Sequence, residues 1–190
     1  TQPGDVVLIE RPTYFLVQDI FTSHGLNVKS LPMKEAGGVN VERLGELLES
    51  GEMEPPRMIY VIPTHQNPTG RTMSIKDRWK LAVIASRYGI LVAADEVYHL
   101  LDWRDEARDG RRPARFAVLD SKIATKSGTS HLGCCVTISS FTKTFAPGVR
   151  CGWIEGPREV IDSLVNLGYI QSQVCLSLPL LVCSRLSHLS

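Results

Sequence analysis

The chain has 190 residues, 43% hydrophobic and 22% charged, which is enough apolar material for one domain with a buried core. Its formal net charge of +1 lacks the basic excess of proteins that bind nucleic acid or an anionic membrane, so we expect neither partner. The five cysteines form no metal-type pair and no dense disulfide framework, and no apolar run reaches the roughly 18 to 20 residues of a membrane span, so we expect a cytoplasmic protein.

Short apolar runs alternate with amphipathic stretches along most of the chain. In chain order the pattern predicts strand 6–9, helix 13–24, strand 27–31, helix 41–50, strand 58–62, helix 74–88, strand 90–94, strand 136–138, strand 151–154 and a helix from 157 to about 169. Continuous apolar strands that alternate with helices are typical of a mostly parallel sheet covered on both faces. The sequence therefore predicts the α/β class, as a three-layer α/β/α domain.

Residues 102–133 interrupt this alternation. Their first half is densely charged, and the whole stretch shows no clear period. An irregular loop of this length is unusual inside a compact domain. We therefore expect a surface insertion that is at least partly mobile, with a functional lid as the alternative.

Three polar clusters follow predicted strands. Residues 63–70 (Pro-Thr-His-Gln-Asn-Pro-Thr-Gly) follow the third strand, residues 95–99 (Asp-Glu-Val-Tyr-His) follow the fourth, and residues 139–153 follow the fifth. The last cluster places Lys143 between hydroxyl side chains and Arg150 seven residues later. Taken singly, these clusters are also consistent with a turn, a helix cap and a solvated lysine. Because ligands of open parallel sheets bind outside the carboxyl ends of the strands, we expect the three clusters to meet there.

Two other kinds of site lack the residues they need. His65 and His99 have no third ligand at suitable spacing, so we expect no metal site. The Gly-x-Ser-x-Gly elbow of a serine hydrolase does not occur. A lysine amine beside a phosphate-binding arginine suits pyridoxal phosphate instead, since that cofactor needs a Schiff base and an anion clamp.

Taken together, the motifs resemble the large domain of class I/II aminotransferases, which are pyridoxal-phosphate enzymes of fold type I. The motifs are, in order, Pro-x-Tyr at 12–14, Asn-Pro-Thr-Gly at 67–70, Ala-Asp-Glu-Val-Tyr at 94–98 and Ser-Phe-Thr-Lys at 140–143 with Arg150 downstream. The resemblance covers residues 4 to about 169. The Lys143-to-Arg150 gap is one residue shorter than in aspartate aminotransferases. That gap and His65-Gln66 are more similar to the 2-aminoadipate and kynurenine aminotransferase subgroup.

The resemblance implies a role for seven residues. Lys143 would form the Schiff base with pyridoxal 5'-phosphate and later move a proton at the substrate α-carbon. Asp95 would pair with the pyridine nitrogen and keep it protonated. The other implied contacts are Asn67 and Tyr98 to the phenolic oxygen, Tyr14 to the ring face, and Ser140 and Arg150 to the phosphate. Glu96 and His99 receive no role.

The implied function is an aminotransferase that moves an amino group between an amino acid and a 2-oxo acid, working as a homodimer. We expect residues 1–190 to be a partial large domain. The glycine-rich helix N-terminus that helps to bind the phosphate would precede Thr1, and the arginine that binds the substrate carboxylate would follow Ser190. On this expectation the 190-residue chain is inactive by itself.

Two other functions remain open on the same residues. A pyridoxal-phosphate-dependent carbon–sulfur lyase would use the same cofactor site. The effector domain of a winged-helix transcription regulator is the second alternative, because a bacterial regulator family shares the Pro-Gly-x-Arg arrangement of residues 147–150.

Overall fold

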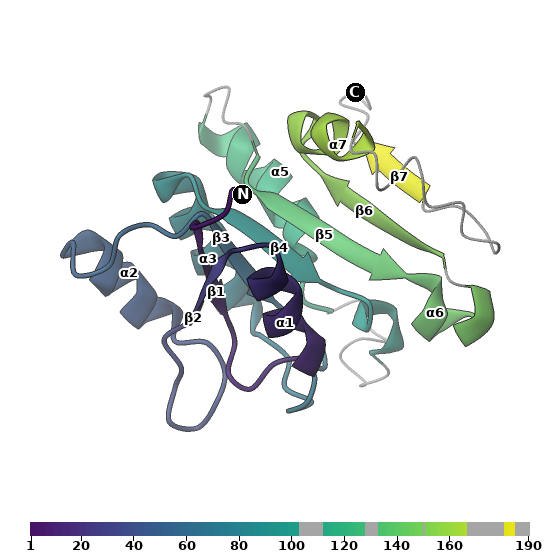
Figure 1. The fold of residues 1–190 in the computed structure, drawn as a ribbon, viewed down its shortest axis with the longest axis horizontal. Helices are drawn as coiled ribbons and strands as arrows, with labels where there is room; N and C mark the ends of the chain where they lie inside the picture. The colour runs from purple at the N-terminus through teal and green to yellow at the C-terminus, as the bar shows by residue number, and fades with distance from the viewer. Residues whose placement is uncertain (103–111, 128–132, 150, 167–180, 185–190) are drawn as a thin grey trace.

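A single sheet organises the chain. The computed structural model of the chain describes residues 1–102, 112–127, 133–149, 151–166 and 181–184. Its seven strands are ordered β2-β1-β3-β4-β5-β6-β7 (Figure 1). They are β1 (Val6–Ile9), β2 (Asn27–Ser30), β3 (Met58–Val61), β4 (Leu91–Asp95), β5 (Cys135–Ser140), β6 (Gly152–Gly156) and β7 (Leu181–Ser184). The first five are mutually parallel, while β6 runs antiparallel to β5 and parallel to β7.

Helices connect the parallel strands and cover both faces. They are α1 (Phe15–Ser23), α2 (Val41–Glu49), α3 (Ile75–Tyr88), α5 (Phe116–Ser127), α6 (Phe141–Thr144) and α7 (Arg158–Val165), with 3-10 turns η1 (His99–Leu101) and η2 (Pro147–Val149). Within the described ranges, no helix combines the length and the apolar character needed to cross a membrane.

The core lies in two layers, one on each face of the sheet. Because successive strand residues point to opposite faces, Leu8 and Ile59 pack with α2, α3 and α5, while Val7 and Tyr60 pack with α1. Figure 1 shows α1 in front of the sheet and α3 behind it. The three-layer α/β/α arrangement predicted from the apolar strands is therefore confirmed.

Helix α3 illustrates how the sequence sets the element boundaries. The Ser74 hydroxyl accepts a hydrogen bond from the Asp77 N–H at 3.0 Å and caps the first turn. At the other end Gly89 adopts a left-handed φ of 66°, which glycine tolerates without strain. Both signals are visible in the sequence, and the predicted and observed limits of this helix agree to within one residue.

The prediction of an irregular insertion over residues 102–133 is wrong for residues 116–127, which form α5. Phe116 and Leu119 of this helix are buried in the hydrophobic core. The periodic pattern was obscured by Asp120, a buried acid whose carboxylate accepts a hydrogen bond from the Cys134 N–H at 3.0 Å. The charged stretch 103–111 and residues 128–132 lie outside the described residues, so an insertion there stays a prediction.

Helix α7 ends at Val165, earlier than the predicted end near residue 169.

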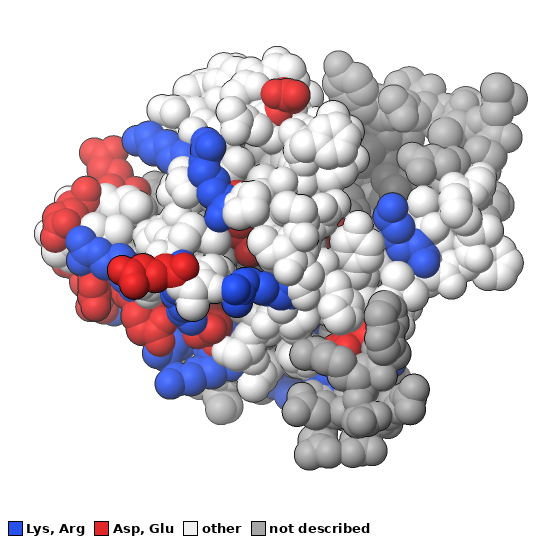
Figure 2. All heavy atoms as spheres, turned by 90° about the horizontal axis from the view of Figure 1, so that it is seen from below, with Lys and Arg blue, Asp and Glu red and all other residues white. Residues whose placement is uncertain are grey.

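Charged side chains of both signs share the surface. Figure 2 shows Lys and Arg interspersed with Asp and Glu on the side of the molecule that carries α2, with uncharged atoms across the middle of this view. Arg43 pairs with Glu46 at 3.1 Å and Lys80 with Glu42 at 2.6 Å in this region. The face in view therefore presents no continuous surface of one sign.

Candidate active site

The carboxyl ends of β3, β4 and β5 enclose a cavity of about 450 Å³, called here the Lys143 cavity. Its lining includes six of the seven residues predicted to bind the cofactor: Tyr14, Asn67, Asp95, Tyr98, Ser140 and Lys143. The seventh, Arg150, lies outside the described residues, so its phosphate-binding role stays a prediction. The structure thus brings together side chains that are up to 129 positions apart in the sequence.

Lys143 lies on α6, a single helical turn that begins directly after β5. Ser140 fixes the start of this turn, since its hydroxyl accepts from the Thr142 N–H at 3.1 Å and donates to the Cys151 carbonyl at 3.2 Å. The Lys143 Nζ lies 6.0 Å from the centre of the Tyr98 ring. A short, capped helical turn therefore holds Lys143, with its amine near the Tyr98 ring.

Asp95 is the last residue of β4, and its carboxylate has two described donors. The Tyr60 hydroxyl donates to Oδ2 at 2.7 Å, and the Val97 N–H makes a longer contact of 3.4 Å with Oδ1. Burial raises the pKa of Asp95, while the hydrogen bonds from Tyr60 and Val97 and the charge of Lys143 act in the opposite direction. The site therefore contains a partly desolvated carboxyl beside a lysine amine.

Gln66 joins the two loops that carry Tyr14 and Asn67. Its Nε2 donates to the Pro12 carbonyl at 2.7 Å, and its Oε1 accepts from the N–H and hydroxyl of Thr69 at 3.0 Å and 2.6 Å. Gln66 is itself buried. Its amide therefore holds the loop after β3 against the loop after β1.

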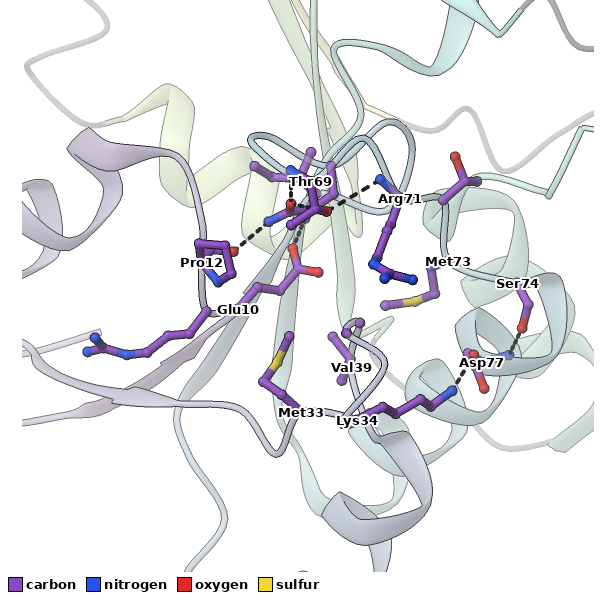
Figure 3. A pocket seen from close by; sticks show the side chains of 16 residues that line it. Glu10, Pro12, Met33, Lys34, Val39, Thr69, Arg71, Met73, Ser74 and Asp77 are labelled. Carbon is purple, nitrogen blue, oxygen red and sulfur yellow. Dashed lines mark hydrogen bonds and ion pairs between the residues drawn. The ribbon is translucent and has the colours of Figure 1, made fainter.

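A second cavity of about 320 Å³ is lined in part by these loops, and Figure 3 shows Glu10, Pro12 and Thr69 around it. It shares Ile62 with the Lys143 cavity. We call it the Glu10 cavity. Glu10 is buried, and its Oε2 accepts from the Ile62 N–H at 2.8 Å. Burial raises the pKa of Glu10 to about 7, although hydrogen bonds from Ile62 and Gln66 oppose the shift. None of the residues predicted to bind the cofactor lines this cavity.

Glu96, which the sequence left without a role, belongs to a buried ionic network. Its carboxylate lies 3.5 Å from Arg78 Nη1 and 3.0 Å from Arg115 Nε, and it accepts from the Phe116 N–H at 3.3 Å. Arg78 also donates to the Pro63 carbonyl at 2.7 Å and to the Thr64 hydroxyl at 2.8 Å. This network joins α3, the end of β4 and the start of α5 directly beneath the loop that carries Asn67.

Four supporting residues were missed by reasoning from sequence: Tyr60, Glu10, Gln66 and Arg78. Tyr60, Glu10 and Gln66 each carry a polar group in an otherwise apolar or turn-forming segment, whereas Arg78 stands among other charged residues of α3. Tyr60, for example, is the one hydroxyl-bearing residue of strand β3, Met58–Val61. A buried polar group needs a partner, so that pattern is the signal that could have identified the first three.

Within the described part of the chain, one group of side chains has the spacing of metal ligands. The ligand atoms of Asp120, Cys134 and Cys135 lie within 4.8 Å of one another. This group is at the opposite end of β5 from Ser140. A hydrogen bond with Cys134 and burial raise the pKa of the Cys135 thiol well above its usual range, which favours the neutral thiol over the thiolate that binds metals.

The model of the family "Aminotransferase class I and II" matches residues 1–180. The chain belongs to this family. Among the relatives of this aminotransferase chain, an aromatic amino acid aminotransferase of Schizosaccharomyces pombe is 34% identical over 186 residues, covering 93% of this chain and 38% of the relative. The resemblance inferred from the motifs is thereby confirmed.

Solved structures of aminotransferases have the same fold. A kynurenine aminotransferase from Pyrococcus horikoshii superposes with a TM-score of 0.70 at 29% identity, covering 86% of this chain and 37% of that one. An alpha-aminoadipate aminotransferase from Thermus thermophilus, complexed with N-(5'-phosphopyridoxyl)-L-leucine, gives a TM-score of 0.65 at 28% identity, covering 86% and 38%. The chain therefore spans less than two fifths of the length of these relatives.

Proposed function

We propose that the complete protein is a pyridoxal 5'-phosphate-dependent aminotransferase that transfers an amino group between an amino acid and a 2-oxo acid. The observation that carries this proposal is the convergence of Lys143, Asp95, Asn67 and Tyr98 on one cavity. Family membership supports the same reaction class.

The residues of the Lys143 cavity fit this cofactor. A volume of about 450 Å³ is within the range of small-molecule sites. The donor set offers an amine for the aldehyde (Lys143), a carboxylate for the ring nitrogen (Asp95), an amide and a phenol for the phenolic oxygen (Asn67, Tyr98), and a hydroxyl for the phosphate (Ser140). When bound, the cofactor supplies an electron sink for negative charge at the substrate α-carbon.

The residues that line the cavity would then have separate roles in the reaction. Lys143 binds the aldehyde and, once displaced by substrate, holds and returns the proton at the α-carbon. Asp95 keeps a negative charge opposite the ring nitrogen, so a proton is held there. Tyr14 and Trp153, which also line the cavity, limit the access of water to the reacting atoms.

Replacing Lys143 tests this proposal. In the full-length protein, Lys143→Ala is expected to abolish transamination, since no other described lysine lines the cavity. Borohydride reduction followed by mass spectrometry should locate the covalently bound cofactor on Lys143 in the wild type and should find none in the variant. Lys122→Ala, at an exposed lysine of α5, is the matched control and should retain activity. Full transamination by Lys143→Ala would refute the assignment.

The relatives suggest where a substrate screen should begin. Their names include aminotransferases of aromatic amino acids, kynurenine and alpha-aminoadipate. We infer that the full-length protein accepts an amino acid from this set. The screen would measure loss of each donor with 2-oxoglutarate as acceptor, and donor loss without any acceptor would instead indicate a lyase.

We further infer that the full-length protein is a cytoplasmic homodimer. Helix α1 supports an additional contact, because Phe15 is 75% exposed, Ile20 is 50% exposed and Leu16 is 40% exposed. An apolar helix face of this kind is commonly covered in an assembly. Light scattering on the full-length protein would test the dimer, and a monomer at micromolar concentration would exclude it.

A further inference from the structure

The Tyr60 hydroxyl makes a short hydrogen bond to the Asp95 carboxylate. The two residues lie on neighbouring parallel strands, where Tyr60 is in register with Ala93, two positions before Asp95. Side chains two positions apart on a strand share a face, so Tyr60 reaches the carboxylate along the α1 side of the sheet. The distance from Tyr60 Oη to Asp95 Oδ2 is 2.7 Å, the usual length of an O–H···O hydrogen bond.

The core holds the Tyr60 ring in position. Tyr60 is 6% exposed, and its ring packs edge-on against Phe21 at 5.9 Å between centroids. A buried phenol requires a partner for its hydroxyl, and Asp95 is that partner. Burial and the negative charge of Asp95 raise the pKa of Tyr60, so its hydroxyl remains a donor across the physiological pH range.

This bond distinguishes the two oxygens of Asp95. Oδ2 accepts from Tyr60, whereas Oδ1 has only the weaker 3.4 Å contact with the Val97 N–H. Asp95 itself lines the Lys143 cavity. Oδ1 is therefore the oxygen left to accept from a cationic N–H donor in that cavity. Other groups also act on this pair: the charge of Lys143 lowers the pKa of Asp95, and Glu10 and Tyr14 raise that of Tyr60.

We propose that Tyr60 is a positioning residue that holds the Asp95 carboxylate in place and leaves Oδ1 for the protonated ring nitrogen of the cofactor. This inference rests on the proposed function, because it assumes a pyridine ring in the cavity. Its physical basis is that a fixed donor on one oxygen favours the ionised carboxylate, which desolvation alone would disfavour. Tyr60 acts only through Asp95.

Ligand binding to the full-length protein tests the proposal without a catalytic readout. The probes are pyridoxamine 5'-phosphate, which needs no bond to Lys143, and its analogue with carbon in place of the ring nitrogen. Tyr60→Phe keeps the ring and removes the hydroxyl, and is expected to raise the Kd for pyridoxamine 5'-phosphate by on the order of tenfold, because Asp95 then lacks the donor that fixes it and favours its ionised form. The Kd for the carbon analogue should change by less than about twofold, because it lacks the nitrogen that Asp95 contacts.

Tyr88→Phe is the matched control, since it removes a tyrosine hydroxyl from α3, outside the cavity, and should change neither Kd. If Tyr60→Phe prefers pyridoxamine 5'-phosphate over the carbon analogue as strongly as the wild type does, the role of Tyr60 is overturned and the pairing of Asp95 with the cofactor stands. Equal affinity of the wild type for the two probes would overturn both this role and the proposed pairing of Asp95 with the cofactor.

A direct titration of Asp95 provides a second readout. Carboxylate carbon shifts in the full-length apoprotein should show the Asp95 midpoint moving up by about one pH unit in Tyr60→Phe. Incorporation of 3-fluorotyrosine at position 60, which makes the hydroxyl a stronger donor and conserves the packing, should move the midpoint down. The fluorinated protein keeps the test valid if Tyr60→Phe does not fold, and an unchanged midpoint in it would contradict the proposal.

Discussion

Glu10 shows how one buried carboxyl links stability to pH. Its side chain accepts from the Ile62 N–H in the wall between the two cavities, and burial raises its pKa from 4.5 to about 7. Between these two values the folded chain keeps a proton that the unfolded chain has released. The folded state is therefore penalised progressively as the pH rises from about 4.5 to about 7, and the penalty stays constant above that range.

Glu10→Gln is expected to remove this penalty. Relative to the wild type, the variant should gain on the order of 2 to 3 kcal/mol between pH 5 and pH 8, because an amide does not ionise and can still accept from Ile62. Urea unfolding of both proteins at the two pH values measures the difference. The same substitution at the exposed Glu46 controls for the amide itself, and a wild-type-to-variant difference that is equal at both pH values would contradict the assignment.

At this scale the sequence predicted the residues that reach into the cavity but not those that hold them. Lys143, Asp95 and Asn67 stand in motifs that follow strands, so their types and spacing indicated the chemistry. Tyr60 and Gln66 were missed because their partners are distant in the chain: Asp95 lies 35 positions from Tyr60, and Pro12 lies 54 positions from Gln66. Such pairings depend on which strands and loops become neighbours in the folded sheet, and short motifs along the chain do not reveal this.

Among the elements, α3 is attached to the site by an arginine that is fully buried. Arg78 joins Glu96, beside Asp95, to the carbonyl of Pro63 at the start of the Asn67 loop. Arg115, at the start of α5, shares the same carboxylate and also pairs with Glu155 of β6. The network therefore connects α3, the start of α5, the end of β4, β6 and the Asn67 loop.

Arg78→Met should destabilise the protein by about 3 kcal/mol, since it leaves Glu96 buried with less compensation and strips donors from backbone carbonyls. Arg87→Met is the control on the same helix: Arg87 pairs with Glu49 at 2.6 Å, but the two side chains are 64% and 58% exposed. Exposed pairs contribute at most about 1 kcal/mol. Urea denaturation measures the free energy of unfolding of both variants. Equal losses of stability would show that the buried network stabilises the protein no more than the exposed pair does.

The elements themselves were largely predictable. The strands β1, β3 and β4 are short apolar runs with turn residues at their ends, and each was predicted to within about one residue of its observed limits. Helix α5 was not predicted, because Asp120 sits within its apolar pattern and a charged stretch precedes it. Its burial depends on contacts with α3 and β5, which the sequence alone does not reveal.

Taken whole, the chain is an α/β domain that covers less than two fifths of its relatives' length. It carries the Lys143 cavity within residues 14–154. The apolar residues Phe15 and Ile20 stay exposed on α1. In the relatives, more than half of each molecule lies outside the matched region.

Residues 1–190 expressed alone are expected to bind pyridoxal 5'-phosphate weakly and to show negligible transamination. The reasons for this expectation are that the chain matches less than two fifths of the relatives' length and that Phe15 and Ile20 remain exposed on α1. Absorbance titration with the cofactor and an amino-donor assay, each run beside the full-length protein, measure this. Turnover by residues 1–190 that equals the full-length rate would show that the remainder is dispensable.

The strand order has a consequence for how the molecule is made. After β1 and β2, every later strand of the sheet joins the same growing edge, in the order β3, β4, β5, β6, β7. A nascent chain leaving the ribosome can therefore add each strand to an edge already present: β3 covers the free edge of β1, and each later strand covers the open N–H and C=O groups of the strand before it. Tyr14, Asn67, Asp95 and Lys143 emerge in that same sequence. The strand order therefore allows the cavity to be assembled from one side to the other, and Lys143 is the last of these four residues to be synthesised.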